Sequence, residues 1–225
     1  MNLVKISSEV IEGKELNRDE INSNKIYLIV KRCMDFIGAL CGIVLLSPVF
    51  LIVALLIKYE DPKGSVFFKQ ERVGKDGTRF NMYKFRSMVI DAEDKLNDLL
   101  QLNEASGAMF KMKEDPRVTK IGRFIRKTSI DELPQLINVL KGEMSLVGPR
   151  PPLPREVKEY TPYDMQRLMV TPGCTGLWQV SGRNDIGFEE MVCLDIFHIK
   201  NRKIMLDIKI IIATFAVFFS SKGAY

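Results

Sequence analysis

The sequence predicts an α/β fold, a helix-rich compact domain with a small β-hairpin that is anchored by an N-terminal helix inserted in a membrane. Three observations lead to this fold class. Residues 36–57 hold 22 positions without a charged side chain. Residues 65–88 place two runs of aromatic and basic side chains on either side of Gly-Lys-Asp-Gly, as in a hairpin. Residues 133–140 repeat apolar side chains at helical spacing, so one face of that segment packs on a core.

The chain of 225 residues is long enough for one domain with a sizeable core. We predict a polar lead-in over 1–30, a membrane-inserted helix over 31–60 and a cytosolic domain over 61–225. The lead-in lacks the short apolar run of a secretory signal. The lead-in carries a net charge of −1 within a total of +5, so the rest of the chain carries +6. This excess favours an anionic partner such as phosphate, a lipid surface or nucleic acid.

The charge-free segment is long enough to reach across a bilayer. As a straight helix it measures about 33 Å, close to the hydrocarbon thickness. Ser47 and Pro48 lie at its middle, where proline removes one backbone hydrogen bond and a nearby serine can satisfy the freed carbonyl. Basic residues at both ends fit a re-entrant helix with both ends on the cytosolic face. A simple span with a proline kink is the alternative that these residues leave open.

The second arm of the predicted hairpin carries a row of cations. In a strand, alternation places Tyr83 and Phe85 on one face and Lys84 and Arg86 on the other. Lys84 and Arg86 are therefore candidates for binding an anion. The alternative interpretation is an ordinary solvated strand face.

Two adjacent carboxylates, Asp131 and Glu132, are predicted near the start of the amphipathic helix that ends at Gly142. One interpretation is structural: Ser129 and Glu132 have the spacing of a capping box, and acidic groups stabilise a helix N-terminus. The other interpretation is catalytic, because basic residues surround this stretch in the sequence. The pair alone favours capping, and only the rest of the chain favours catalysis.

Three further arginines are candidates for contacts with phosphate. Arg126 belongs to a basic run that a helix would gather on one side. Arg150 lies within Gly-Pro-Arg-Pro-Pro at 148–152, where prolines restrict the backbone and would hold the cation in place. Arg183 follows a glycine-rich stretch that contains the only tryptophan, Trp178.

The inventory of reactive groups narrows the chemistry. His198 is the only histidine, and the four cysteines lack metal-ligand spacing, which argues against histidine-based metal or nucleophilic sites. Carboxylates among cations beside a membrane helix suit phosphoryl transfer. An aspartate can attack phosphorus, guanidinium groups offset the charge, and a glutamate can hold Mg²⁺. Nucleic-acid binding would give the membrane segment and the carboxylates no role.

Several motifs together resemble one family over about residues 31–225. They are the Ser47-Pro48 helix, Tyr83-Lys84-Phe85-Arg86-Ser87-Met88, Ser129-Ile130-Asp131-Glu132-Leu133-Pro134-Gln135, Gly148-Pro149-Arg150-Pro151, Pro172-Gly173-Cys174-Thr175-Gly176 and Gln179-Val180-Ser181-Gly182-Arg183-Asn184. In this order they resemble the bacterial sugar transferases, the monotopic polyprenyl-phosphate phosphoglycosyl transferases that initiate surface polysaccharide synthesis.

The resemblance implies an enzyme at the cytosolic face of the bacterial cytoplasmic membrane, held by a re-entrant helix and interfacial amphipathic helices. A UDP-sugar would be the donor and undecaprenyl phosphate the acceptor. Asp131 would be the nucleophile and Glu132 would bind Mg²⁺, while Lys84, Arg86, Arg126, Arg150 and Arg183 would bind the phosphates or nucleotide. Membrane lipids, a second copy of the chain and downstream glycosyltransferases are further expected partners; nucleic acid is not. The alternative function is a non-catalytic membrane module that binds lipid or a partner protein.

Overall fold

The computed structural model describes residues 16–92, 94–95, 99, 112, 115–182 and 186–219. Its longer helices are α3 (Lys25–Glu60), α5 (Lys120–Lys127), α6 (Gln135–Lys141), α10 (Phe188–Lys200) and α11 (Ile204–Phe219). Shorter ones are α2 (Arg18–Ser23), α7 (Pro154–Val157), α8 (Pro162–Met165) and α9 (Leu177–Ser181), with 3-10 turns η2 (Lys75–Gly77), η4 (Ile130–Glu132) and η5 (Gln166–Met169). The strands are β1 (Phe67–Val73), β2 (Arg79–Phe85), β3 (Ser145–Val147) and β4 (Gly173–Thr175). The predicted helix-rich domain with small sheets is confirmed.

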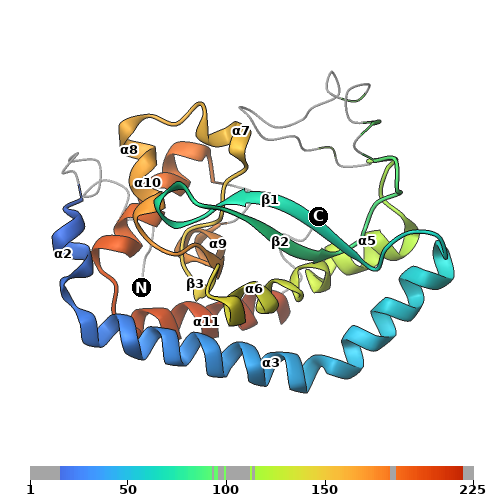
Figure 1. Ribbon diagram of the computed structural model, residues 1–225, viewed down its shortest axis with the longest axis horizontal. Helices are drawn as coiled ribbons and strands as arrows, with labels where there is room; N and C mark the ends of the chain where they lie inside the picture. The colour runs from blue at the N-terminus through green and yellow to red at the C-terminus, as the bar shows by residue number, and fades with distance from the viewer. Residues whose placement is uncertain are drawn as a thin grey trace.

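The described part of the predicted lead-in, residues 16–30, is largely helical, which the sequence did not indicate. Helix α2 lies within the predicted lead-in, and α3 already begins at Lys25, before the predicted segment 31–60. Helix α3 continues through Pro48 to Glu60 as one bent helix that runs beneath the rest of the domain (Figure 1). The Ser47 hydroxyl donates a hydrogen bond of 2.8 Å to the Val44 carbonyl. This is the carbonyl that Pro48, lacking an N–H, leaves unbonded, so the predicted compensation by serine is confirmed.

Among the described residues, α3 alone is long and apolar enough to cross a membrane. Its outer surface exposes large apolar side chains along its length, including Leu45, Leu51 and Leu55. Its inner surface packs on the domain in both halves: Ala39 joins a core with Met82 and Val139, while Val53 and Ile57 join a second core around Phe85. Both halves of the helix therefore contact the same folded body.

The hairpin has the predicted arms and turn. Strands β1 and β2 are antiparallel, and η2 occupies the Gly-Lys-Asp-Gly turn. Lys84 pairs with Phe68 and Phe80 pairs with Arg72, so Lys84 and Arg72 share one face of the hairpin. Phe85 lies on the other face, stacked on Phe67 with ring centroids 5.4 Å apart. The alternation predicted for residues 83–85 is confirmed.

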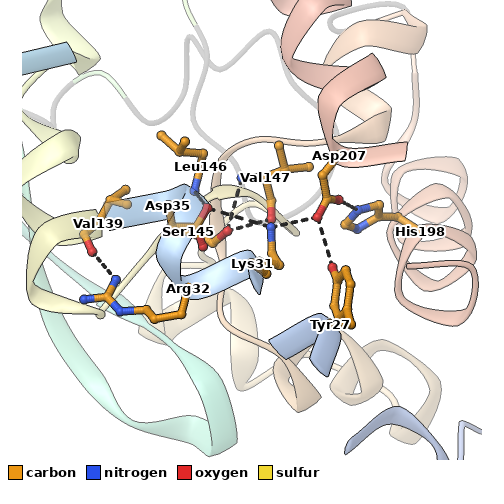
Figure 2. Close-up of polar contacts among 10 residues, drawn as sticks. All are labelled: Tyr27, Lys31, Arg32, Asp35, Val139, Ser145, Leu146, Val147, His198 and Asp207. Carbon is orange, nitrogen blue, oxygen red and sulfur yellow. Dashed lines mark hydrogen bonds and ion pairs between the residues drawn. The ribbon is translucent and has the colours of Figure 1, made fainter. Parts of the chain in front are cut away.

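A buried polar cluster attaches the first turns of α3 to the C-terminal part of the chain (Figure 2). The Asp207 carboxylate at the start of α11 accepts a hydrogen bond from the Tyr27 hydroxyl at 3.0 Å and pairs with the Lys31 ammonium at 3.0 Å. His198 of α10 lies 2.9 Å from the second oxygen of Asp207, and Asp35 accepts the backbone N–H of Leu146 in β3. Because Asp207 is fully buried, these partners fix α3 against α10, α11 and β3.

Arg32 makes the next contact along α3. Its guanidinium donates to the Val139 carbonyl at 2.6 Å (Figure 2). It also donates to the Leu140 carbonyl at 2.8 Å, near the C-terminal end of α6. Both carbonyls lie in the last turn of α6, where the Gly142 N–H also donates to the Val139 carbonyl at 3.0 Å, and a cation there complements the helix dipole. Helix α6 leads back to the Asp131–Glu132 pair, so α3 is tied directly to the element that follows the candidate site.

Candidate active site

The carboxylate pair lies in the connection between α5 and α6. Asp131 and Glu132 form the 3-10 turn η4, and α6 begins at Gln135. The predicted capping box is wrong: Ser129 has a left-handed backbone, with φ of 53°, and its side chain makes no capping hydrogen bond. Pro134 contributes to this departure because it lacks the N–H that a continuous helix through this point would need. The predicted end of the helix at Gly142 is confirmed by its left-handed φ of 84°.

A close backbone contact sets the position of η4. Gly122 in α5 lies against the Ser87 carbonyl just after β2, where an added Cβ would come within 1.9 Å of that oxygen. The Thr119 N–H donates to the same carbonyl at 3.1 Å. Helix α5 is therefore held against the end of the hairpin, and the turn that follows it carries Asp131 and Glu132 towards the face that bears Lys84.

Glu132 is joined to the hairpin by an ion pair. The Lys84 ammonium lies 2.7 Å from Oε1 of Glu132, whose side chain retains 42% of its accessible surface. Burial acts to raise the pKa of Glu132, but Lys84, Arg150 and Arg72 outweigh it, so this pKa lies below its usual range. Glu132 is thus an ionised carboxylate that is still open to an incoming ligand.

Asp131 differs from its neighbour because it is 8% exposed. Burial raises its pKa, Lys84 and Arg126 lower it and Glu132 raises it, and with these effects together the pKa of Asp131 is about 6. Two adjacent carboxylates with pKa values shifted in opposite directions are typical of acidic groups that have different chemical tasks. At neutral pH, Asp131 is a desolvated carboxylate.

Arg126 and Arg150 reach the pair from two other elements. Arg126, near the end of α5, lowers the pKa of Asp131 by its positive charge, and Arg150 does the same for Glu132. The Arg150 guanidinium also contacts Glu156 at 3.4 Å. The structure therefore brings Lys84, Arg126 and Arg150 around the two carboxylates.

The Gly-Pro-Arg-Pro-Pro segment is held rigidly, as predicted. The N–H groups of Gly173 and Val73 donate to the carbonyls of Pro149 and Pro152, at 2.8 and 2.9 Å. Arg167, itself paired with a buried aspartate, donates to the Arg150 carbonyl at 3.3 Å. Contacts from three parts of the chain thus fix the backbone on either side of Arg150.

Arg72 is a site residue that the sequence analysis missed. It is 5% exposed and donates to the Pro151 carbonyl at 2.9 Å. Burial and the nearby Arg150 lower its pKa and Glu156 and Glu132 raise it, so that the pKa of Arg72 is about 9. The antiparallel register places Arg72 of β1 on the same face of the hairpin as Lys84 of β2. This shared face is the signal that could have identified Arg72.

The remaining two predicted cations are placed differently. Arg86 pairs with Asp61 at 2.8 Å, immediately after α3, and its guanidinium occupies the space beside Gly64. Its described contacts are therefore with the segment at the end of α3 and not with the carboxylate pair. Arg183 lies outside the described residues.

The chain is similar in sequence to a family of known proteins. Residues 26–221 match the family model described as bacterial sugar transferase. The galactosyl transferase CpsE of Streptococcus agalactiae is 50% identical over 199 residues, which cover 88% of this chain and 44% of the relative. The UDP-galactose-lipid carrier transferase of Erwinia amylovora is 45% identical, over 87% of this chain and 42% of the relative.

A third relative is the undecaprenyl-phosphate galactose phosphotransferase of Salmonella typhimurium, 44% identical over 87% of this chain and 42% of the relative. The chain thus spans less than half the length of these three relatives. The family model nevertheless covers nearly the whole chain and includes α3, the hairpin, the carboxylate pair and the Arg150 segment. By this match, the chain belongs to the bacterial sugar transferase family.

Proposed function

We propose that this protein transfers a sugar 1-phosphate from a UDP-sugar to undecaprenyl phosphate at the cytosolic face of the bacterial cytoplasmic membrane. The observation that carries the proposal is Asp131, a buried carboxylate beside the Lys84–Glu132 ion pair and under the influence of Arg126. The donor and acceptor follow from relatives named for a UDP-galactose-lipid carrier and for undecaprenyl phosphate. Transfer of this kind would begin the assembly of a surface polysaccharide.

The proposed reaction has two displacements at one phosphorus. An Asp131 carboxylate oxygen attacks the phosphorus that bears the sugar, the bond to the UMP oxygen breaks, and UMP leaves. A phosphate oxygen of undecaprenyl phosphate then attacks the same phosphorus. The bond to Asp131 breaks, which regenerates the carboxylate and yields a lipid-linked sugar diphosphate. A buried carboxylate suits the first step because it carries no tight hydration shell that must be removed before attack.

Arg126, Arg150 and Lys84 would offset the negative charge that otherwise repels Asp131 from a diphosphate. Such positioned cations stabilise transferring phosphoryl groups, and guanidinium groups bind phosphate with two parallel hydrogen bonds. Arg150 is especially suited because its backbone is fixed on both sides. Arg72 would act behind it by holding the Pro151 carbonyl.

We also propose Mg²⁺ as the cofactor, with Glu132 as its ligand. Among the described residues no group of three or more acidic, cysteine or histidine side chains could hold a metal. Mg²⁺ does not require such a cage, because it is commonly bound through one or two carboxylates with substrate phosphates and waters. The half-exposed, ionised Glu132 fits this mode, and the metal would supply positive charge to the diphosphate.

The contacts of α3 support the re-entrant topology. Lys31 and Asp35 near its start and Val53 and Ile57 near its end all pack on the same domain. A helix that crossed the bilayer would place these two ends on opposite sides, about 30 Å apart. Single cysteines introduced at Asn24 and Lys63, in a chain whose four native cysteines are serine, should both react with a reagent confined to the cytosol. Reaction of the two positions from opposite sides would exclude re-entry.

Asp131→Asn is the test of the proposed reaction. The amide has nearly the same shape but is a poor nucleophile, so UMP release should fall by at least about a thousandfold. Mass spectrometry of parent enzyme quenched with a UDP-sugar should locate the added sugar phosphate on the peptide that contains Asp131. Near-normal turnover of Asp131→Asn would rule out Asp131 as the nucleophile, whereas absence of UMP release from the parent chain would favour the non-catalytic membrane module. Lys75→Gln, in the exposed hairpin turn, is the matched control and should leave turnover unchanged.

A further inference from the structure

The side chain of Asn138 bonds the edge of β2 that faces away from β1. Asn138 is fully buried in α6, the helix that follows the carboxylate pair. Its carbonyl oxygen accepts the Tyr83 N–H at 3.0 Å, and its amide nitrogen donates to the Asn81 carbonyl at 2.7 Å. Among the described residues no strand pairs with this edge of β2, and the amide supplies bonds that such a strand would make there. One side chain of α6 therefore holds the backbone of the hairpin.

Glu143 fixes the orientation of the Asn138 amide. The amide nitrogen donates a second hydrogen bond, of 2.7 Å, to Oε2 of Glu143, just after the end of α6. An amide nitrogen has two N–H donors, so both are used. Rotation of the amide would turn its oxygen towards two acceptors and its nitrogen towards the Tyr83 N–H. The three bonds are therefore compatible with a single orientation of the side chain.

The bonded stretch of β2 leads directly into Lys84. The Lys84 ammonium lies 2.7 Å from Oε1 of Glu132, 48 positions away in the chain. Glu132 in turn lies just before α6. The Asn138 side chain is thus a noncovalent bridge between the two parts of the chain that carry this ion pair. Because it is fully buried, it acts through the backbone of β2 and not by touching a substrate.

We propose that Asn138 is a positioning residue that holds Lys84 beside Glu132 and Asp131. Lysine has a flexible four-carbon stem, so its ammonium is placed only as precisely as the backbone beneath it. Catalytic groups must stay within about 0.5 Å of their productive geometry, and hydrogen bonds behind them provide that precision. For turnover, the proposal rests on the transfer reaction proposed above. Loss of the amide should weaken the effect of Lys84 on both carboxylates.

The first test removes the amide. Asn138→Leu keeps a similar volume and loses all three bonds, and Asn138→Ser is a milder variant for the case that leucine prevents folding. With either, kcat/KM at pH 7.5 should fall about tenfold. The loss of rate at acid pH should also begin at higher pH, because a displaced Lys84 lowers the pKa of Asp131 less. Thr214→Val is the matched control: it removes a 2.8 Å bond between the hydroxyls of Thr214 and Thr175 and should leave the pH profile unchanged.

A double-mutant cycle separates positioning from a general loss of stability. If Asn138 acts through Lys84, Asn138→Leu should reduce kcat/KM of the Lys84→Gln chain by no more than about twofold, because the group that it positions is already absent. All chains are compared well below their unfolding temperatures. A residue with a purely structural role would cost the same tenfold in both chains. That result would overturn the proposal, as would an unmoved pH profile in both Asn138→Leu and Asn138→Ser.

A third readout needs no transfer activity. The difference in unfolding free energy between the parent and Asp131→Asn depends on pH through the ionisation of Asp131. With Asn138→Leu added to both chains, this dependence should extend to higher pH, as measured in nanodiscs. An unchanged dependence would overturn the positioning role. A shifted dependence in a protein that releases no UMP would support the positioning of Lys84 and contradict only the proposed transfer, so the two failures are distinct.

Discussion

The Lys84 ammonium lies 2.7 Å from Oε1 of Glu132, which joins residues 48 positions apart in the chain. The contact connects the β1–β2 hairpin to the turn between α5 and α6. It also gives the two neighbouring carboxylates different properties: Glu132 keeps a lowered pKa beside its partner, whereas the buried Asp131 has a pKa of about 6.

The first prediction concerns the pH dependence of transfer. The Asp131 carboxylate must be ionised to attack, and burial raises its pKa to about 6. We therefore expect kcat/KM to fall about tenfold per pH unit below pH 6 and to be level above it. Initial rates of UMP release between pH 5 and 8 measure this fall, which is the acid limb of the pH profile. A limb centred near pH 4, the usual range of an aspartate, would contradict the assigned environment.

The second prediction concerns the stability of the Asp131→Asn variant. Because the pKa of Asp131 is raised in the folded protein, the folded state holds a proton between about pH 4 and 6 that the unfolded chain has released. Stability of the parent therefore falls as the pH rises through this window, and asparagine removes the effect. At pH 7.5 the variant should be more stable than the parent by roughly 1–3 kcal/mol. Thermal unfolding in nanodiscs at pH 5 and 7.5 tests this, and the advantage should shrink at pH 5.

The third prediction concerns Lys84. Its charge lowers the pKa of both Asp131 and Glu132, so Lys84→Gln should move the acid limb of the pH profile to higher pH. Turnover at pH 7.5 should also fall, by roughly ten- to a hundredfold, through loss of a cation at the diphosphate. Lys141→Gln is the control, because Lys141 is exposed and bonds the Tyr83 hydroxyl away from the carboxylates. An unchanged limb in Lys84→Gln would disprove the electrostatic role.

The fourth prediction concerns Arg72. Arg72→Gln removes the hydrogen bond to the Pro151 carbonyl and should destabilise the protein by about 1–3 kcal/mol. The KM for the donor should rise more than kcat falls, because Arg150 is displaced while Asp131 is untouched. Unfolding and initial-rate measurements separate these effects. Arg79→Gln, which breaks only an exposed ion pair with Glu71, should change stability by less than about 1 kcal/mol.

The fifth prediction concerns the contact between α5 and the hairpin. Alanine usually favours a helix over glycine, but in Gly122→Ala the new methyl group would meet the Ser87 carbonyl. Overpacking of this kind costs about 1–3 kcal/mol, so the variant should unfold at a lower temperature. Gly187→Ala meets no atom within 4 Å and should have a smaller effect. Equal effects of the two changes would show that α5 can shift away from Ser87.

Several features of this protein could be predicted from short stretches of sequence. Pro48 and the neighbouring Ser47 determine a helix that loses one hydrogen bond and regains it locally. Gly74 and Gly77 flank a hairpin turn, and Gly142 supplies the left-handed residue that ends α6. Each of these depends on residues within a few positions of one another, where backbone sterics and hydrogen bonding decide the conformation. The order of motifs was sufficient to predict the family.

Other features were decided only by tertiary contacts. Arg72 and the Pro151 carbonyl are 79 positions apart, and nothing near Arg72 in the sequence indicates that it is buried. Arg86 is predicted to bind phosphate or nucleotide, and only the folded chain shows that its side chain pairs with Asp61 at the end of α3. Ser129 has the spacing of a capping residue, but it adopts a left-handed backbone between α5 and η4. The sequence by itself therefore determined the local elements and the reactive groups. The tertiary structure decided which charges meet, because burial and pairing depend on surfaces that come together only in the folded chain.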